Sequence, residues 1–138
     1  MAQESEDDKI RCDEMEQYYI LAETVKQNID YDVLLQSYPN EGQLVQGIYE
    51  LIVETVAYTG KKLVVASNEL PAELVKNRLM KLNFMHIQYV ISSMKKNTTE
   101  IKNIKKYLLA ALYNAPATMQ GYYQAEVNHA MPQYAKRN

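Results

Sequence analysis

The residues best suited to bind a ligand gather between Lys95 and Tyr113, where Glu100 is the only acidic residue. Lysine side chains neutralise phosphate groups, and a tyrosine ring offers a stacking surface to an unpaired base. The stretch therefore predicts contact with an anionic partner, for which phosphate is the natural candidate. The candidate lysines are Lys95, Lys96, Lys102, Lys105 and Lys106.

Helical spacing places part of this set on one surface. On a helix with 3.6 residues per turn, Lys102, Lys106 and Tyr113 fall on one side, away from the apolar positions of the same segment. Lys102 and Lys106 are four residues apart and repel each other, which destabilises the isolated helix. A bound anion would reduce this repulsion. The alternative is a solvated lysine face beside a half-buried Tyr113.

Signatures of catalysis or metal binding are missing. Gly60-Lys61 is not a phosphate-binding loop, because the glycine expected five residues earlier is Thr55 and no Ser or Thr follows the lysine. His86 and His129 lie far apart, with no Cys or acidic pattern beside them, so structural or surface histidines are expected. We expect no catalytic residue, no cofactor and no metal site, and hence a protein that is not an enzyme.

Composition indicates one mainly helical domain. The chain has 138 residues, 47% hydrophobic and 23% charged, with only four Gly and four Pro. A single cysteine, Cys12, cannot form an internal disulfide, and no signal peptide or membrane span is evident, so a cytoplasmic location is expected. Residues 1–60 carry thirteen acidic side chains against three basic ones, and residues 61–138 carry twelve basic against four acidic. This asymmetry indicates either an anion-seeking half or two halves that pack with their charges facing.

Apolar periodicity predicts the elements that position these residues. We expect a compact bundle of five to seven helices with at most one short β-hairpin near 62–70. Pro116 should end the lysine-bearing helix, Asn97 with Glu100 should cap its start, and a last helix should run through Tyr122 and Tyr123. The predicted ranges are an acidic disordered tail or linker over 1–10, a helical domain over 11–132 and a disordered tail over 133–138.

Two sets of apolar residues mark the predicted inner faces. The stripe of the first helix comprises Met15, Tyr18, Tyr19, Ala22 and Val25. The predicted common core comprises Ile48, Ile52, Val75, Leu79, Ile87, Ile91, Ile104, Leu108 and Leu112.

Several strings of the sequence resemble a known family in order along the chain. The segment 97–116, NTTEIKNIKKYLLAALYNAP, resembles a signature of the C-terminal domain of replication initiator protein A from plasmids and integrative elements of Firmicutes. The likeness covers about residues 12–132. Its other strings are NIDYDVLL at 28–35, ELIVETV at 50–56, PAELVKNR at 71–78, and the pairs Tyr122-Tyr123 and Asn128-His129.

This resemblance implies a fold similar to the helical DnaD domain and a role in replication initiation. Members of that family recruit host replication proteins, so primase or the helicase-loading machinery is the implied partner, with DNA as an auxiliary one. The origin-reading winged-helix domain of full-length members has no counterpart in this sequence. The alternative is a structural or oligomerising helical domain that does not bind DNA.

DnaD-type domains also carry a DNA-associated helix patterned Tyr-x-x-x-Ile-x-x-x-Trp. In that register this sequence has Tyr107, Ala111 and Ala115, so the tyrosine matches and the other two positions do not. Tyr107 therefore joins the candidate site residues. The missing tryptophan shifts the expectation from DNA contact towards protein docking.

Overall fold

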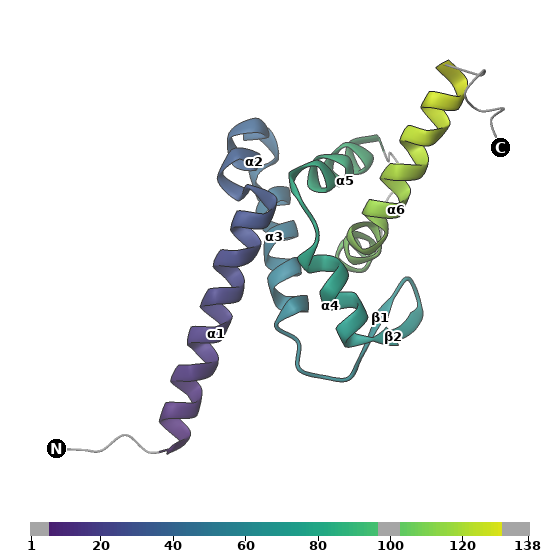
Figure 1. Ribbon diagram of the computed structural model, residues 1–138. Coiled ribbons are helices and arrows are strands. Elements are labelled where there is room, and N and C mark those ends of the chain that lie inside the picture. Colours follow the sequence, from purple (N-terminus) through teal and green to yellow (C-terminus); the bar gives the residue numbers. More distant parts are fainter. Residues whose placement is uncertain (1–5, 97–102, 131–138) are drawn as a thin grey trace.

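A computed structural model of the chain describes residues 6–96 and 103–130, the side chains of 7, 8, 10 and 122–130 excepted. The prediction of a mainly helical domain with one short hairpin is confirmed (Figure 1). The elements are α1 (Glu6–Ile29), α2 (Tyr31–Ser37), the 3-10 helix η1 (Pro39–Glu41), α3 (Gly42–Val56), β1 (Lys62–Val65), β2 (Asn68–Pro71), α4 (Ala72–Met80), α5 (Phe84–Lys96) and α6 (Ile104–Ala130).

Helix α3 forms the centre of the domain. It contacts α1, α2, α4 and α6, and its apolar residues are buried on several sides, as expected for a helix surrounded by others. Eight of the nine predicted core residues are buried. The ninth prediction was wrong, because Ile104 is 54% exposed. It shares a helix face with the buried Leu108, but it lies in the first turn of α6, beside a surface groove lined by Gly47 and Leu51 of α3.

The hairpin lies where the sequence predicts it. Strands β1 and β2 are antiparallel, and the pair Val65 and Asn68 closes a two-residue turn. Both turn residues have positive φ, 52° at Ala66 and 68° at Ser67. That conformation is typical of hairpin turns, which usually place Asn or Gly there, so the sequence offered no turn signal. The hairpin contacts α4 through both strands and α6 through β1.

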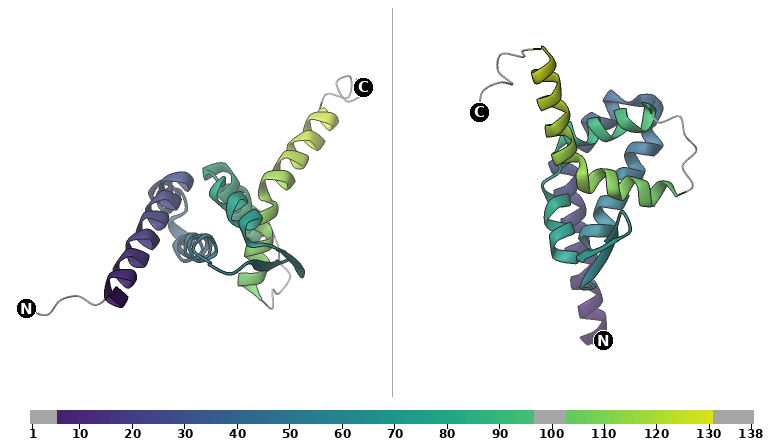
Figure 2. Two further views of the ribbon diagram at one scale, coloured as in Figure 1. Left: turned by 60° about the horizontal axis from the view of Figure 1, so that its bottom comes forward. Right: turned by 90° about the vertical axis from the view of Figure 1, so that its right-hand side faces the viewer.

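Helix α1 is longer than predicted and only partly packed. It begins at Glu6, within the range 1–10 for which the sequence predicts an acidic tail or linker, and negative charge near a helix N-terminus is electrostatically favourable. From about Leu21 onwards it packs against α2, α3 and α5. Residues 11–20 are all exposed, and this part of α1 projects from the body (Figures 1 and 2). The predicted inward stripe is therefore buried in its second half only.

Side-chain contacts of Tyr49 and Lys26 help to hold the packed part of α1. The Tyr49 hydroxyl donates a hydrogen bond to the Ala22 carbonyl oxygen at 3.2 Å. The Lys26 ammonium lies 5.5 Å from the ring centroids of both Tyr49 and Tyr31. Burial raises the pKa of the Tyr49 hydroxyl, so it remains a neutral hydrogen-bond donor at physiological pH.

Helix α6 runs through Pro116 instead of ending there. The prediction of two separate helices was wrong, since Ile104–Ala130 is one helix with Pro116 inside it. The helix changes direction sharply along its length (Figure 2), as expected where a proline removes an intrahelical hydrogen bond and crowds the preceding turn. The predicted cap, Asn97 with Glu100, lies outside the described residues. Asn103 Oδ1 accepts a hydrogen bond from the Lys106 backbone N–H at 3.0 Å and caps the described start.

Candidate functional site

The candidate lysines Lys95 and Lys105 form ion pairs with acidic residues of the first half. Lys95 Nζ lies 2.6 Å from Glu41 Oε1 and 5.7 Å from the centroid of the Tyr38 ring. Lys105 Nζ lies 3.0 Å from Glu54 Oε2. These pairs join α5 to η1 and α6 to α3. Lys95 and Lys105 therefore contribute to cohesion between the halves, and their charges are compensated within the domain.

Lys96 and Lys106 differ from Lys95 and Lys105 in their surroundings. Both are exposed, and within the described ranges neither forms an ion pair. Lys96 ends α5, where a positive charge is favoured by the helix dipole, whereas Lys106 lies in the first turn of α6, where it is disfavoured. An anion bound near Lys106 would relieve that cost. Lys102, the fifth candidate, lies outside the described residues.

Tyr113 does not provide the expected stacking surface. Its side chain is only 9% exposed and belongs to the core. The Arg78 guanidinium carbon lies 4.3 Å from its ring centroid and covers one face of the ring. The prediction that Tyr113 shares an exposed face with Lys106 was wrong, because α4 packs against this part of α6.

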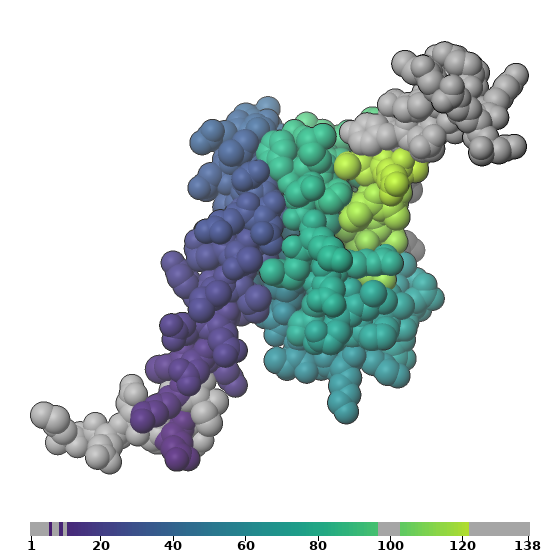
Figure 3. Space-filling view, viewed as in Figure 1, coloured from purple at the N-terminus to yellow at the C-terminus, as the bar shows by residue number. Residues whose placement is uncertain are grey.

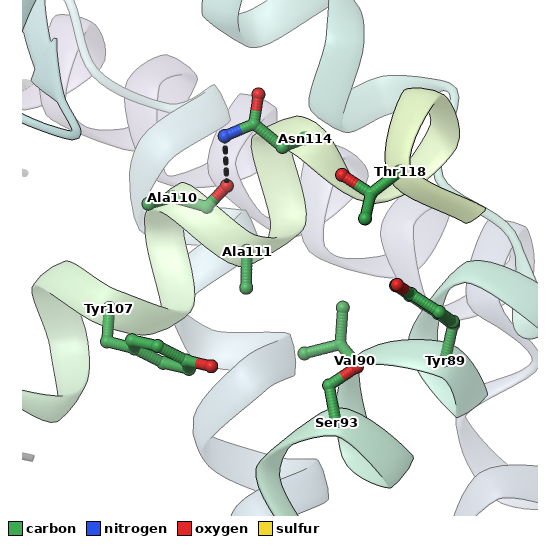
Figure 4. Close-up of a pocket in the computed structure, with 8 residues that line it drawn as sticks. All are labelled: Tyr89, Val90, Ser93, Tyr107, Ala110, Ala111, Asn114 and Thr118. Carbon is green, nitrogen blue, oxygen red and sulfur yellow. Dashed lines mark hydrogen bonds between the residues drawn. The ribbon is translucent and has the colours of Figure 1, made fainter. Parts of the chain in front are cut away.

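Tyr107, in contrast, lines a pocket between α5 and α6. The cavity has a volume of about 310 Å³. In Figure 4 the rings of Tyr107 and Tyr89 lie at opposite ends of the pocket, with Val90, Ser93 and Ala111 between them. The lining of the pocket therefore combines an apolar floor with hydroxyl groups. Its lining residues are Tyr89, Val90, Ser93, Tyr107, Ala110, Ala111, Asn114 and Thr118.

Lys96 and Lys106, which form no ion pair within the described ranges, lie close in sequence to residues that line the pocket. Lys106 precedes the pocket residue Ala110 by four residues and so lies about one turn before it on α6. Lys96 follows Ser93 by three residues and lines a second, adjoining hollow that shares Tyr89 and Ser93 with the first. Lys96 thus lines the hollow next to the pocket, and Lys106 precedes the pocket residues along α6. An elongated anionic ligand with an apolar or aromatic group matches this arrangement.

Sequence reasoning missed Tyr89, Ser93 and Asn114. Tyr89 and Ser93 are four residues apart in α5, next to the predicted inner face, and periodicity alone gave no reason to single them out. Asn114 is exposed, and its Nδ2 donates to the Ala110 carbonyl oxygen at 3.0 Å (Figure 4). A spacing of four residues from Lys106 through Ala110 to Asn114 was the signal available in the sequence.

Neither a metal-binding cluster nor a membrane-crossing helix is found over residues 6–96 and 103–130. No group of three or more His, Cys, Asp or Glu side chains there lies close enough together to hold a metal ion. None of the helices described combines the length and apolar character needed to cross a bilayer.

Comparison with known proteins identifies a family. No curated protein and no solved structure is significantly similar to the chain. Residues 4–133 match a family described as a family of unknown function, DUF6017. The match spans nearly the whole chain, and the protein therefore belongs to this family.

Proposed function

We propose that this protein is a non-enzymatic recruitment domain of a plasmid or mobile-element replication initiator. It docks a host replication protein, primase or a component of the helicase-loading machinery, and adds an auxiliary contact to single-stranded DNA. The resemblance of its sequence to the C-terminal domain of replication initiator protein A supports this role. The cytoplasm is the compartment of such a function, and the single cysteine is compatible with it.

The observation that carries the proposal is the pocket between α5 and α6, with Lys96 in the adjoining hollow and Lys106 one turn before Ala110 on α6. Its apolar floor can accept a hydrophobic side chain, and the lysines can pair with acidic residues or phosphates that flank it. Ala111 stands where the DnaD pattern has isoleucine, and its small side chain leaves the pocket open. A protein segment with an apolar anchor and acidic flanks is the occupant that uses both features.

Direct binding to purified host primase and helicase loader tests this docking. Asn114→Phe should fill the pocket and weaken binding by about tenfold or more, the loss expected when a central anchor is excluded. Ala117→Phe is the matched control, because Ala117 is exposed on the same helix but does not line the pocket. Equal binding by the two variants, or no binding of either host protein by the wild type, would refute the proposal.

The lysines test the DNA contact separately. Lys96→Gln with Lys106→Gln should reduce affinity for single-stranded DNA and flatten the slope of log affinity against log salt by about 1.4. Lys95→Gln with Lys105→Gln is the control, because it removes the same charge from lysines that already have internal partners. If both double variants lose affinity and salt dependence equally, the contact is diffuse and does not belong to the pocket.

A second candidate is a structural or oligomerising domain without DNA binding. The ion pairs Lys95–Glu41 and Lys105–Glu54 favour it, since they join the basic half to the acidic half. In a domain of this kind, the role of Lys95 and Lys105 is to stabilise the fold. Binding of neither host protein nor DNA, even at low salt, would identify this function instead.

A further inference from the structure

The N-terminal part of α1 exposes a stripe of large apolar side chains. Met15 is 73% exposed, Tyr18 47% and Tyr19 64%; we call these three residues the arm stripe. In the space-filling view this part of α1 extends beyond the body of the domain (Figure 3). Clustered apolar surface of this kind is typical of interaction sites, whereas single exposed apolar residues are ordinary.

The arm stripe continues a face of α1 that is already an interface. Helical spacing places Met15, Tyr18 and Tyr19 in line with Ala22, Val25 and Ile29. Val25 and Ile29 are each 1% exposed and pack in the core. The face changes from buried to exposed where the body of the domain ends, without any change in its apolar character. It therefore has the composition of a helix–helix interface that lacks its second helix.

Charge indicates which kind of helix completes the interface. Residues 6–20 contain six acidic side chains and two basic ones, Lys9 and Arg11. Glu14 and Glu16 lie on either side of the arm stripe on a helix of 3.6 residues per turn. Two copies of this arm would bring like charges together beside the apolar contact. A helix with basic flanks would neutralise them.

We propose that the arm stripe docks an amphipathic α-helix of a partner protein whose apolar face is bordered by Lys and Arg. Helix packs against helix, apolar residues cover Met15, Tyr18 and Tyr19, and the basic flanks pair with Glu14 and Glu16. This interaction does not rest on the function proposed above. The α5–α6 pocket selects acidic flanks, whereas the arm selects basic ones, so the two surfaces take different partners.

The test uses the full chain and synthetic peptides as probes. A fluorescein-labelled helical peptide with a leucine stripe flanked by lysines should bind, with affinity that falls as NaCl rises from about 0.05 M to about 0.5 M. The same peptide with glutamate in place of lysine should bind much more weakly. Anisotropy measures both affinities, and equal binding of the two peptides would overturn the choice of a basic partner.

Variants locate the binding surface. Met15→Ser with Tyr18→Ser should weaken binding by about tenfold, as two apolar side chains leave the interface. Ile20→Ser is the matched control, because Ile20 is 55% exposed on the opposite side of the same helix. Since all three positions are exposed, circular dichroism should show unchanged folding for every variant. Equal binding by the double variant and the control would overturn the proposal.

Sedimentation velocity tests whether a second copy of the chain covers the arm stripe instead of a partner helix. The chain alone should remain monomeric, because its acidic arms repel. A dimer that dissociates in the Met15→Ser, Tyr18→Ser variant would show that a second copy covers the stripe, and would overturn the assignment to a basic partner helix.

Discussion

At the scale of the residue, His86 and Asn83 form a reciprocal cap at the start of α5. The Asn83 backbone N–H donates to His86 Nδ1 at 3.1 Å, and the His86 backbone N–H donates to Asn83 Oδ1 at 3.1 Å. This resembles a capping box with histidine in the place of glutamate. Nδ1 can accept only when it carries no proton, so the cap requires neutral histidine. Burial lowers the pKa of His86 below 6.5.

This cap predicts that stability falls in mild acid. Below about pH 6.5 the unfolded chain binds a proton at His86 that the folded chain resists, so the free energy of unfolding should decrease as the pH falls through the lowered pKa. Urea unfolding at several pH values measures the effect. His86→Gln retains a side-chain acceptor that does not titrate, and it should show a weaker pH dependence. Identical pH profiles for the two proteins would contradict this role of His86.

Leu108 and Ile104 share a face of α6 but differ in burial, 5% against 54% exposed. Leu108→Ala should lower the free energy of unfolding by about 2–5 kcal/mol, because a buried cavity remains. Ile104→Ala should cost less than about 1 kcal/mol, because half of the side chain is already in water. Chemical denaturation measures the free energy of unfolding of both variants. Similar costs for the two variants would show that the groove around Ile104 is closed in solution.

At the scale of the element, the hairpin turn keeps two residues in an unfavourable backbone conformation. Ala66 and Ser67 both have positive φ, which costs residues that bear a Cβ atom about 1–2 kcal/mol each. Ala66→Asn with Ser67→Gly supplies the preferred pair and should raise the free energy of unfolding by about 1 kcal/mol. Thermal unfolding provides the measurement. Ser67→Ala keeps the strained backbone and serves as the control, so a comparable gain from Ser67→Ala would exclude turn strain as the cause.

Helices α1 and α6 differ from their predictions. How much of each helix is packed depends on which other elements lie against it. Periodicity marks Met15 and Tyr18 as inward-facing, yet residues 11–20 of α1 are all exposed. Pro116 predicts a helix end, yet α6 continues with a change of direction. Local pattern therefore identified both helices but not how much of each is packed.

At the scale of the whole molecule, the acidic and basic halves meet. Lys95–Glu41 and Lys105–Glu54 are both contacts across this division, and each leaves its side chains partly in water. Such pairs contribute about 0.2–1 kcal/mol each and are screened by salt. The charge asymmetry of the sequence is thus partly satisfied within the fold, and among the described residues Lys96, Lys106 and the acidic side chains Glu14 and Glu16 of α1 have no ion-pair partner.

This arrangement predicts a modest loss of stability with salt. Raising NaCl from about 0.05 M to about 0.5 M should lower the free energy of unfolding by at most about 1 kcal/mol as the two pairs are screened. Glu41→Gln with Glu54→Gln should be less stable at low salt and should respond less to added salt. Denaturant unfolding at each salt concentration checks this, and equal salt responses would mean that the pairs contribute nothing.

The sequence by itself determined the helical class, the position of the hairpin and eight of the nine chosen core residues. These follow from local causes, since apolar spacing and backbone propensity act within a few residues. Only the tertiary structure decided that Lys95 and Lys105 are paired, that Tyr113 is covered by Arg78, and that Tyr89 and Tyr107 share a pocket. Each of these depends on which distant helices become neighbours, and neither the exposure nor the charge partner of a side chain is set by its own helix alone.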